Sequence, residues 1–179
     1  MKNLSIVLLL FAFTFSQAQV LTYEEVSNAQ KRPSSKNIKE YVAQNGEVFK
    51  VGDMITLAQP MNANNLYLYI KDSDGFSYAK QATISSTGFK SEIKKFWVDG
   101  SKRKGFEVQA ISKTEMGMSS YYISIEKAIN SGEIETSVLT REQAIAKLKE
   151  SKDLLDLEMM TQEEYDKIKM ELTPIIKGS

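Results

Sequence analysis

The chain of 179 residues contains neither cysteine nor histidine. Without cysteine, no disulfide or metal–thiolate bond can hold the fold together, so it must form by burial of apolar side chains. Hydrophobic residues make up 42% of the sequence, which is enough for a core of this kind. The same two absences exclude Ser-His-Asp and Cys-His nucleophiles, zinc sites built on His or Cys, and thiol redox chemistry.

Residues 1–19 have the pattern of a secretory signal peptide. Lys2 supplies a positive charge, residues 4–15 are mainly apolar, and small or polar residues follow to Gln19. The apolar run is shorter than the roughly 20 residues that a membrane helix needs. We therefore expect cleavage after Ala18 or Gln19, no stable membrane insertion afterwards, and a periplasmic or extracellular location. A disulfide-free exported chain favours a bacterial source.

The middle of the chain has the pattern of a β-rich domain. Residues 20–45 are mostly polar and predict a loosely ordered lead-in, with one short helix start at the capping box of Thr22 and Glu25. The spacing of Ile38, Tyr41 and Val42 leaves open that one turn of this segment packs on the next domain. Between residues 46 and 136, short β-branched and aromatic segments alternate with turn signals. The clearest segments are residues 48–51, 54–57, 66–70, 93–98, 106–111 and 121–125. A short helix over 126–131, ended by Gly132 in the left-handed conformation, is expected to close this domain.

The last forty residues change to a helical pattern. Thr140 with Gln143 and Thr161 with Glu164 form two capping boxes, and each precedes apolar residues at helical spacing. Pro174 is expected to stop the second helix.

These patterns predict an α+β protein. Its expected parts are a small antiparallel β-sheet or partly open barrel over residues 46–136, followed by a C-terminal two-helix hairpin over residues 139–173. About 35 residues bury too little surface to be stable alone. The hairpin must therefore pack on the β-domain or on a copy of itself.

The predicted hairpin also carries a recognisable motif. A Leu-Lys helix from Leu148 to Leu155 is followed by a second set of residues, namely Thr161, Glu164, Tyr165, Lys169 and Leu172. This pattern resembles the short C-terminal domain family, usually called SHOCT, although that family favours Gly where this chain has Leu157-Glu158. The resemblance implies a helical hairpin that serves oligomerisation or contacts with other macromolecules, without catalysis. The middle domain looks like an uncharacterised domain of exported Bacteroidetes-type proteins, which implies no activity.

Aromatic side chains in the middle domain offer a surface for a ligand. Tyr67 and Tyr69 alternate with the aliphatic residues of 66–70, so the tyrosines are expected to share one face of a strand. This face either packs as core or, together with Trp97, binds a carbohydrate or a lipid headgroup. An envelope ligand-binding protein is therefore the alternative function.

Charged turns give two further candidates. Residues 72–75 resemble half a calcium loop but lack the closing Glu, so we expect a β-turn without a metal. Lys102-Arg103-Lys104 is expected to form a solvated hairpin tip that protects an edge strand, and anion binding is its alternative. Lys+Arg and Asp+Glu are balanced at 23 each, so no overall field favours nucleic acid.

Paired carboxylates are the chemistry that the composition leaves open to an enzyme. A glycosidase needs two carboxyl groups about 5 to 10 Å apart. The candidates are Glu107, Glu126, Glu133 and Glu135. Their spacing does not distinguish a pair, and no Ser-x-x-Lys motif begins a helix. We expect no catalytic residue, cofactor or metal, with a small carboxylate-dependent hydrolase as the lesser alternative.

The sequence therefore predicts an exported, non-catalytic binding or assembly module. Its partner is expected to be a second copy or another envelope protein, bound mainly by burial of apolar surface. The expected interaction residues are Ile145, Leu148, Leu155, Met159, Tyr165, Ile168 and Leu172.

Overall fold

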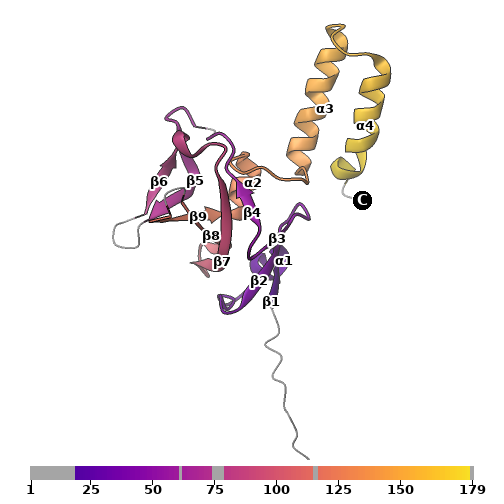
Figure 1. Cartoon of the computed structure of the whole chain (residues 1–179). Helices are drawn as coiled ribbons and strands as arrows, with labels where there is room; N and C mark the ends of the chain where they lie inside the picture. Colours follow the sequence, from indigo (N-terminus) through magenta and orange to yellow (C-terminus); the bar gives the residue numbers. More distant parts are fainter. Residues whose placement is uncertain (1–18, 61, 74–78, 115–116, 178–179) are drawn as a thin grey trace, which may run out of the picture.

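The computed structural model of the chain describes residues 19–60, 62–73, 79–114 and 117–177. Two β-sheets form a body, and a helical hairpin projects from it (Figure 1). The predicted signal peptide, apart from Gln19, and half of the predicted acidic turn at 72–75 lie outside the described residues. None of the helices in these described ranges combines the length and the hydropathy that a membrane span requires.

A three-stranded sheet occupies the start of the described chain. β1 (Gln19–Thr22) pairs in parallel with β2 (Ile38–Val42), which pairs antiparallel with β3 (Val48–Lys50). α1 (Tyr23–Ser27) follows β1 directly. Its predicted capping box is confirmed, because the Thr22 N–H donates to the Glu25 carboxylate at 2.9 Å and the Glu25 N–H donates back to the Thr22 hydroxyl at 3.3 Å.

The expectation of a loosely ordered lead-in over residues 20–45 is wrong. The buried residues of this segment are Leu21, Val26, Ile38, Tyr41 and Ala43, and all belong to the hydrophobic core of the body. They are sparse along a polar segment, so composition alone hides them. Their burial depends on the pairing of β1 with β2, which are separated in the sequence by α1 and a polar loop over residues 28–37.

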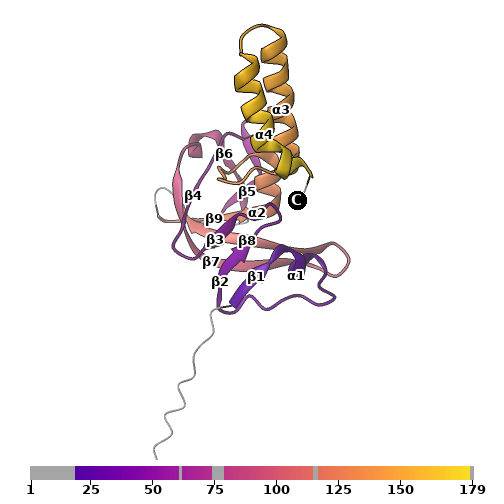
Figure 2. The same cartoon turned by 90° about the vertical axis from the view of Figure 1, so that its right-hand side faces the viewer.

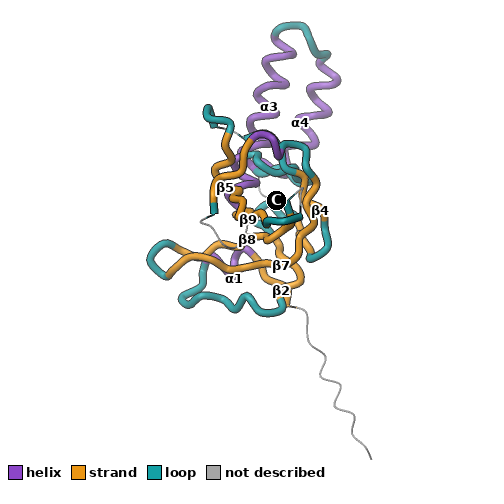
Figure 3. The backbone as a smooth tube through the Cα atoms, turned by 60° about the vertical axis from the view of Figure 1, so that its left-hand side comes forward, coloured by secondary structure: helices purple, strands orange, loops and turns teal. Residues whose placement is uncertain are grey.

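The second sheet has six strands and is antiparallel throughout, in the order β4-β7-β8-β9-β5-β6. Its strands are β4 (Met54–Thr56), β5 (Leu66–Ser73), β6 (Lys80–Thr83), β7 (Lys90–Ser101), β8 (Gly105–Lys113) and β9 (Ser120–Ser124). The sheet curls, so that β4 and β5 stand on opposite sides of it in Figure 3. A 3₁₀ turn, η1 (Ile84–Ser86), follows β6. The predicted small antiparallel sheet is confirmed, and it stays open instead of closing into a barrel.

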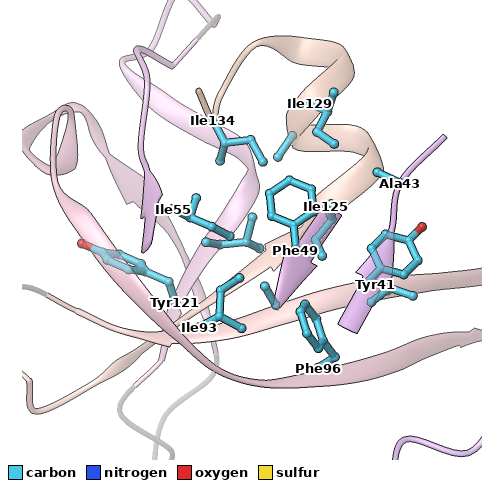
Figure 4. Close-up of a cluster of buried hydrophobic side chains, with 14 of the residues drawn as sticks. Tyr41, Ala43, Phe49, Ile55, Ile93, Phe96, Tyr121, Ile125, Ile129 and Ile134 are labelled. Carbon is cyan, nitrogen blue, oxygen red and sulfur yellow. The ribbon is translucent and has the colours of Figure 1, made fainter. Parts of the chain in front are cut away.

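One core joins the two sheets. The Tyr41 ring of the small sheet lies 6.5 Å from the Phe96 ring of β7, centroid to centroid. Figure 4 shows Phe49 of the small sheet in the same cluster, together with Ile125 and Ile129 of α2 (Ile125–Ser131). The predicted end of α2 is confirmed. Gly132 has φ 70°, and the Glu133 N–H donates to the Ala128 carbonyl at 2.8 Å in a Schellman motif.

The C-terminal hairpin is also confirmed. α3 (Arg141–Asp156) and α4 (Gln162–Lys177) run antiparallel, and Thr140 and Thr161 each cap a helix as predicted. The turn between them is a second Schellman motif, in which Glu158 takes φ 57°.

Pro174 does not stop the second helix as expected, because α4 continues through it to Lys177. The missing proline N–H removes the bond to the Met170 carbonyl. Met170 is exposed, so water can satisfy that carbonyl, and only one helical turn follows the proline.

The strand β5 does not alternate as predicted. Tyr67 and Ile70 are both buried whereas Leu68 is exposed, so the expected division into a tyrosine face and an aliphatic face is wrong. The register of β5 against β6 shifts between Leu66 and Lys71. Within this irregular stretch the buried carboxylate of Glu133 accepts the N–H groups of Leu68 and Tyr69, at 2.6 and 2.9 Å. The irregularity turns Tyr67 into the core.

Candidate functional site

The predicted interaction residues lie along the hairpin, and most of them are only partly covered. Leu172 is buried, Met159 is 73% exposed near the turn, and the rest are half-buried. The half-buried residues are Ile145, Leu148, Leu155, Tyr165 and Ile168. In α3 and α4 the buried residues are Ala144, Ser151 and Leu172. The two helices therefore leave much of their apolar stripe accessible to water.

The hairpin is attached to the body at its base. The Gln143 side chain donates to the Ile129 carbonyl at 3.1 Å. The preceding linker is held by Glu47, whose carboxylate accepts the N–H groups of Ser137 and Val138 at 3.0 and 2.8 Å. Figures 1 and 2 show the remainder of both helices extending away from the sheets.

Residues of the hairpin line two surface cavities. We call the first the tip groove; it has a volume of about 370 Å³ and is lined by Met159, Met160, Glu164, Lys167, Ile168 and Glu171. We call the second the base cleft; it has a volume of about 760 Å³ and lies where the hairpin meets the body. The turn after β2, α2, the linker and the end of α4 each contribute to its lining.

Glu126 is the half-buried carboxylate of the base cleft. Its Oε1 accepts the Tyr41 hydroxyl at 2.6 Å and the Gln44 N–H at 3.1 Å. Burial raises the pKa of Glu126 above its usual value near 4.5, and these two hydrogen bonds oppose part of that rise. Burial and the neighbouring Glu126 carboxylate also raise the pKa of Tyr41, which therefore remains a neutral donor.

The raised pKa of Glu126 predicts a pH-dependent stability. The folded protein holds this proton more tightly than the unfolded chain, so its contribution is full below pH 4.5 and is lost as the pH rises through the folded pKa. We expect the melting temperature of the wild type, relative to Glu126→Gln, to fall as the pH rises from about 4 to 7. Glu135→Gln removes an equal charge at an exposed site and is the control. A difference that is constant, or that grows with pH, would contradict the prediction.

The structure does not assemble the predicted aromatic ligand face. Tyr67 is 0% exposed, and its hydroxyl donates to the Ala58 carbonyl at 2.5 Å. Tyr69 is on β5, whereas Trp97 is on β7, and the two strands β9 and β8 lie between them. Arg32 lies over one face of the Trp97 ring, with its guanidinium carbon 4.8 Å from the ring centroid, and Trp97 remains 42% exposed. Tyr67 is therefore a core residue, and Trp97 contacts Arg32 in the loop between α1 and β2.

The candidate catalytic carboxylates have separate structural partners. Glu107 pairs with Lys127 at 2.6 Å, Glu133 binds the backbone of β5, and Glu135 is exposed. Over the described ranges, no cluster of three or more acidic side chains suited to a metal ion occurs.

The basic turn at 102–104 is an exposed hairpin tip between β7 and β8, as expected. Whether it binds anions stays a prediction.

Sequence reasoning did not find the base cleft. The sequence does not distinguish Glu126 from the other three candidate carboxylates, because its partners Tyr41 and Gln44 are more than eighty residues away along the chain. The capping box at Thr140 is the sequence signal that lies nearest to this cleft. It fixes the start of α3, and its Gln143 also donates to the Ile129 carbonyl of α2. Comparisons with protein-family models, curated proteins and solved structures find no match for this chain. Its function must therefore be inferred from the geometry of the hairpin and the cleft.

Proposed function

We propose that this protein is an exported, non-catalytic assembly module in which the hairpin of one copy binds the hairpin of a second copy. The observation that carries the proposal is the incomplete burial of the hairpin. Among seven apolar residues predicted to interact, Leu172 is buried and the others remain at least partly exposed. The body does not cover them, because it meets the hairpin mainly at its base.

The length and packing of the helices support a second hairpin as the partner that buries these exposed apolar residues. Each helix has 16 residues, which corresponds to a length of roughly 24 Å. Two such helices alone form a marginal core. Two hairpins placed side by side form a four-helix bundle, in which the apolar stripes face a shared interior. Burial of that surface, at about 25 cal/mol per Å², provides the driving force.

The charges of the hairpin favour an antiparallel pair. α4 begins with the acidic residues Glu163, Glu164 and Asp166 near the turn, whereas Lys147 and Lys149 lie in the middle of α3. When two copies run in opposite directions, the acidic turn end of one approaches the lysines of the other. Such exposed pairs add little affinity, but they select one orientation.

Light scattering tests this proposal through the mass in solution. We expect residues 20–179 to form a dimer and a truncated chain ending at Ser137 to be a folded monomer. Met159→Lys should weaken the dimer at least about tenfold, because it places a charge in the interface. Met118→Lys, at an 80% exposed residue of the body, is the matched control. If both chain lengths are folded monomers, self-association is wrong and the hairpin is a contact for a different protein.

A further inference from the structure

The base cleft has the dimensions and lining of a small-molecule site, and the proposed assembly does not use it. Its volume of about 760 Å³ falls within the roughly 300 to 1,000 Å³ typical of ligand pockets. Its apolar lining comes from Ile129, Val138, Leu139, Pro174 and Ile175. Apolar walls with a few polar groups are characteristic of sites for organic ligands.

Glu126 retains acceptor capacity toward this cleft. Its Oε1 is occupied by Tyr41 and Gln44, whereas Oε2 has one long contact, 3.4 Å from the Gln44 N–H. A carboxylate can accept about four hydrogen bonds. The adjacent Lys127 does not neutralise it, because its ammonium group pairs with Glu107 at 2.6 Å. Among the described residues Glu126 therefore has hydrogen-bond donors but no ion-pair partner.

The remaining charges of the cleft favour a cation. Glu142 and Arg141 also line it, so the lining contains two carboxylates and one guanidinium. One of the Arg141 hydrogen-bond donors is already used, because its Nε donates to the Ile176 carbonyl at 2.8 Å. A cleft with excess negative charge concentrates positively charged ligands.

We propose that the base cleft binds a primary ammonium group attached to an apolar body. The ammonium group donates to Oε2 of Glu126 in a charge-assisted hydrogen bond, and the apolar body lies against Ile129, Leu139 and Ile175. An ammonium group has three donors and no acceptor, which suits the open lone pairs of this carboxylate and the side-chain oxygens of Gln44 and Asn130. A peptide N-terminus and a lysine side chain share this chemistry.

Titration calorimetry of the full chain with three probes tests the proposal. The probes are the dipeptide Leu-Leu amide with a free N-terminus, its N-acetylated form, and Nα-acetyl-lysine methylamide. We expect at least one ammonium-bearing probe to bind, and the acetylated dipeptide to bind at least tenfold more weakly or not at all. The stronger of the two ammonium probes identifies the source of the ligand. Equal binding of the acetylated dipeptide, or no binding of either ammonium probe, would overturn the proposal.

Two variants test the role of Glu126 in different ways. Glu126→Gln removes the charge, and Asn130→Lys adds an ammonium group four residues along α2, where it can occupy Glu126 intramolecularly. Each should weaken binding of the ammonium probe at least tenfold. The controls are Glu135→Gln and Met118→Lys, which make the same charge changes away from the cleft. Unchanged affinity in either Glu126→Gln or Asn130→Lys would overturn the proposal. These binding measurements and the light-scattering mass test different proposals, so either proposal can fail without the other.

Discussion

Replacement of Glu133 by glutamine is expected to lower the free energy of unfolding by about 2 to 4 kcal/mol. The Glu133 side chain is 0% exposed, and its two oxygens accept the backbone N–H groups of Leu68 and Tyr69 at 2.6 and 2.9 Å. A glutamine keeps the shape but replaces one oxygen with an NH₂ group. One buried backbone N–H then faces a donor and loses its acceptor, in a place that water does not reach.

Thermal unfolding followed by circular dichroism provides the measurement. For a chain of this size, the expected loss corresponds to a decrease of roughly 5 to 15 °C in melting temperature. The matched control is Glu135→Gln, two residues further along and exposed. A Glu133→Gln variant that melts within about 1 °C of the control would show that β5 does not depend on this carboxylate.

Local features of the chain were predictable from the sequence. The capping boxes at Thr22, Thr140 and Thr161 and the left-handed Gly132 each depend on residues within a few positions, so they can be identified without the fold. The apolar spacing in the last forty residues likewise predicted a two-helix hairpin. These signals were sufficient for the α+β class and for the location of the hairpin.

Features that depend on distant residues were not predictable. Glu133 binds β5 across more than sixty residues of sequence, and Glu126 binds Tyr41 across eighty-five. Strand periodicity predicted Tyr67 and Tyr69 on one face because it assumes a regular strand. The irregularity of β5, where Glu133 binds the backbone, breaks that assumption. The base cleft is assembled from four separate segments, so no single stretch of the sequence carries its pattern.

The second large effect is expected from replacement of Gly100 by alanine at the end of β7. Gly100 has φ +105°, a conformation that side chains rarely adopt, and an added Cβ would overlap with the carbonyl oxygen of Gly105. It would also lie 3.1 Å from the Cα of Phe106. Because these atoms are backbone, the hairpin of β7 and β8 must shift to accept the methyl group. We expect a loss of about 2 to 4 kcal/mol in stability.

Gly105→Ala separates the overlap from the unusual backbone angle. Gly105 has φ +82° and no atom within 4 Å of an added Cβ, so its variant carries the conformational cost alone, about 1 to 2 kcal/mol. Urea unfolding of the two variants measures the difference in their midpoints at equal m-values. Gly100→Ala should unfold at the lower urea concentration. Equal midpoints would mean that the β7–β8 tip moves freely enough to relieve the overlap, and the basic residues 102–104 would then not be held in one place by this turn.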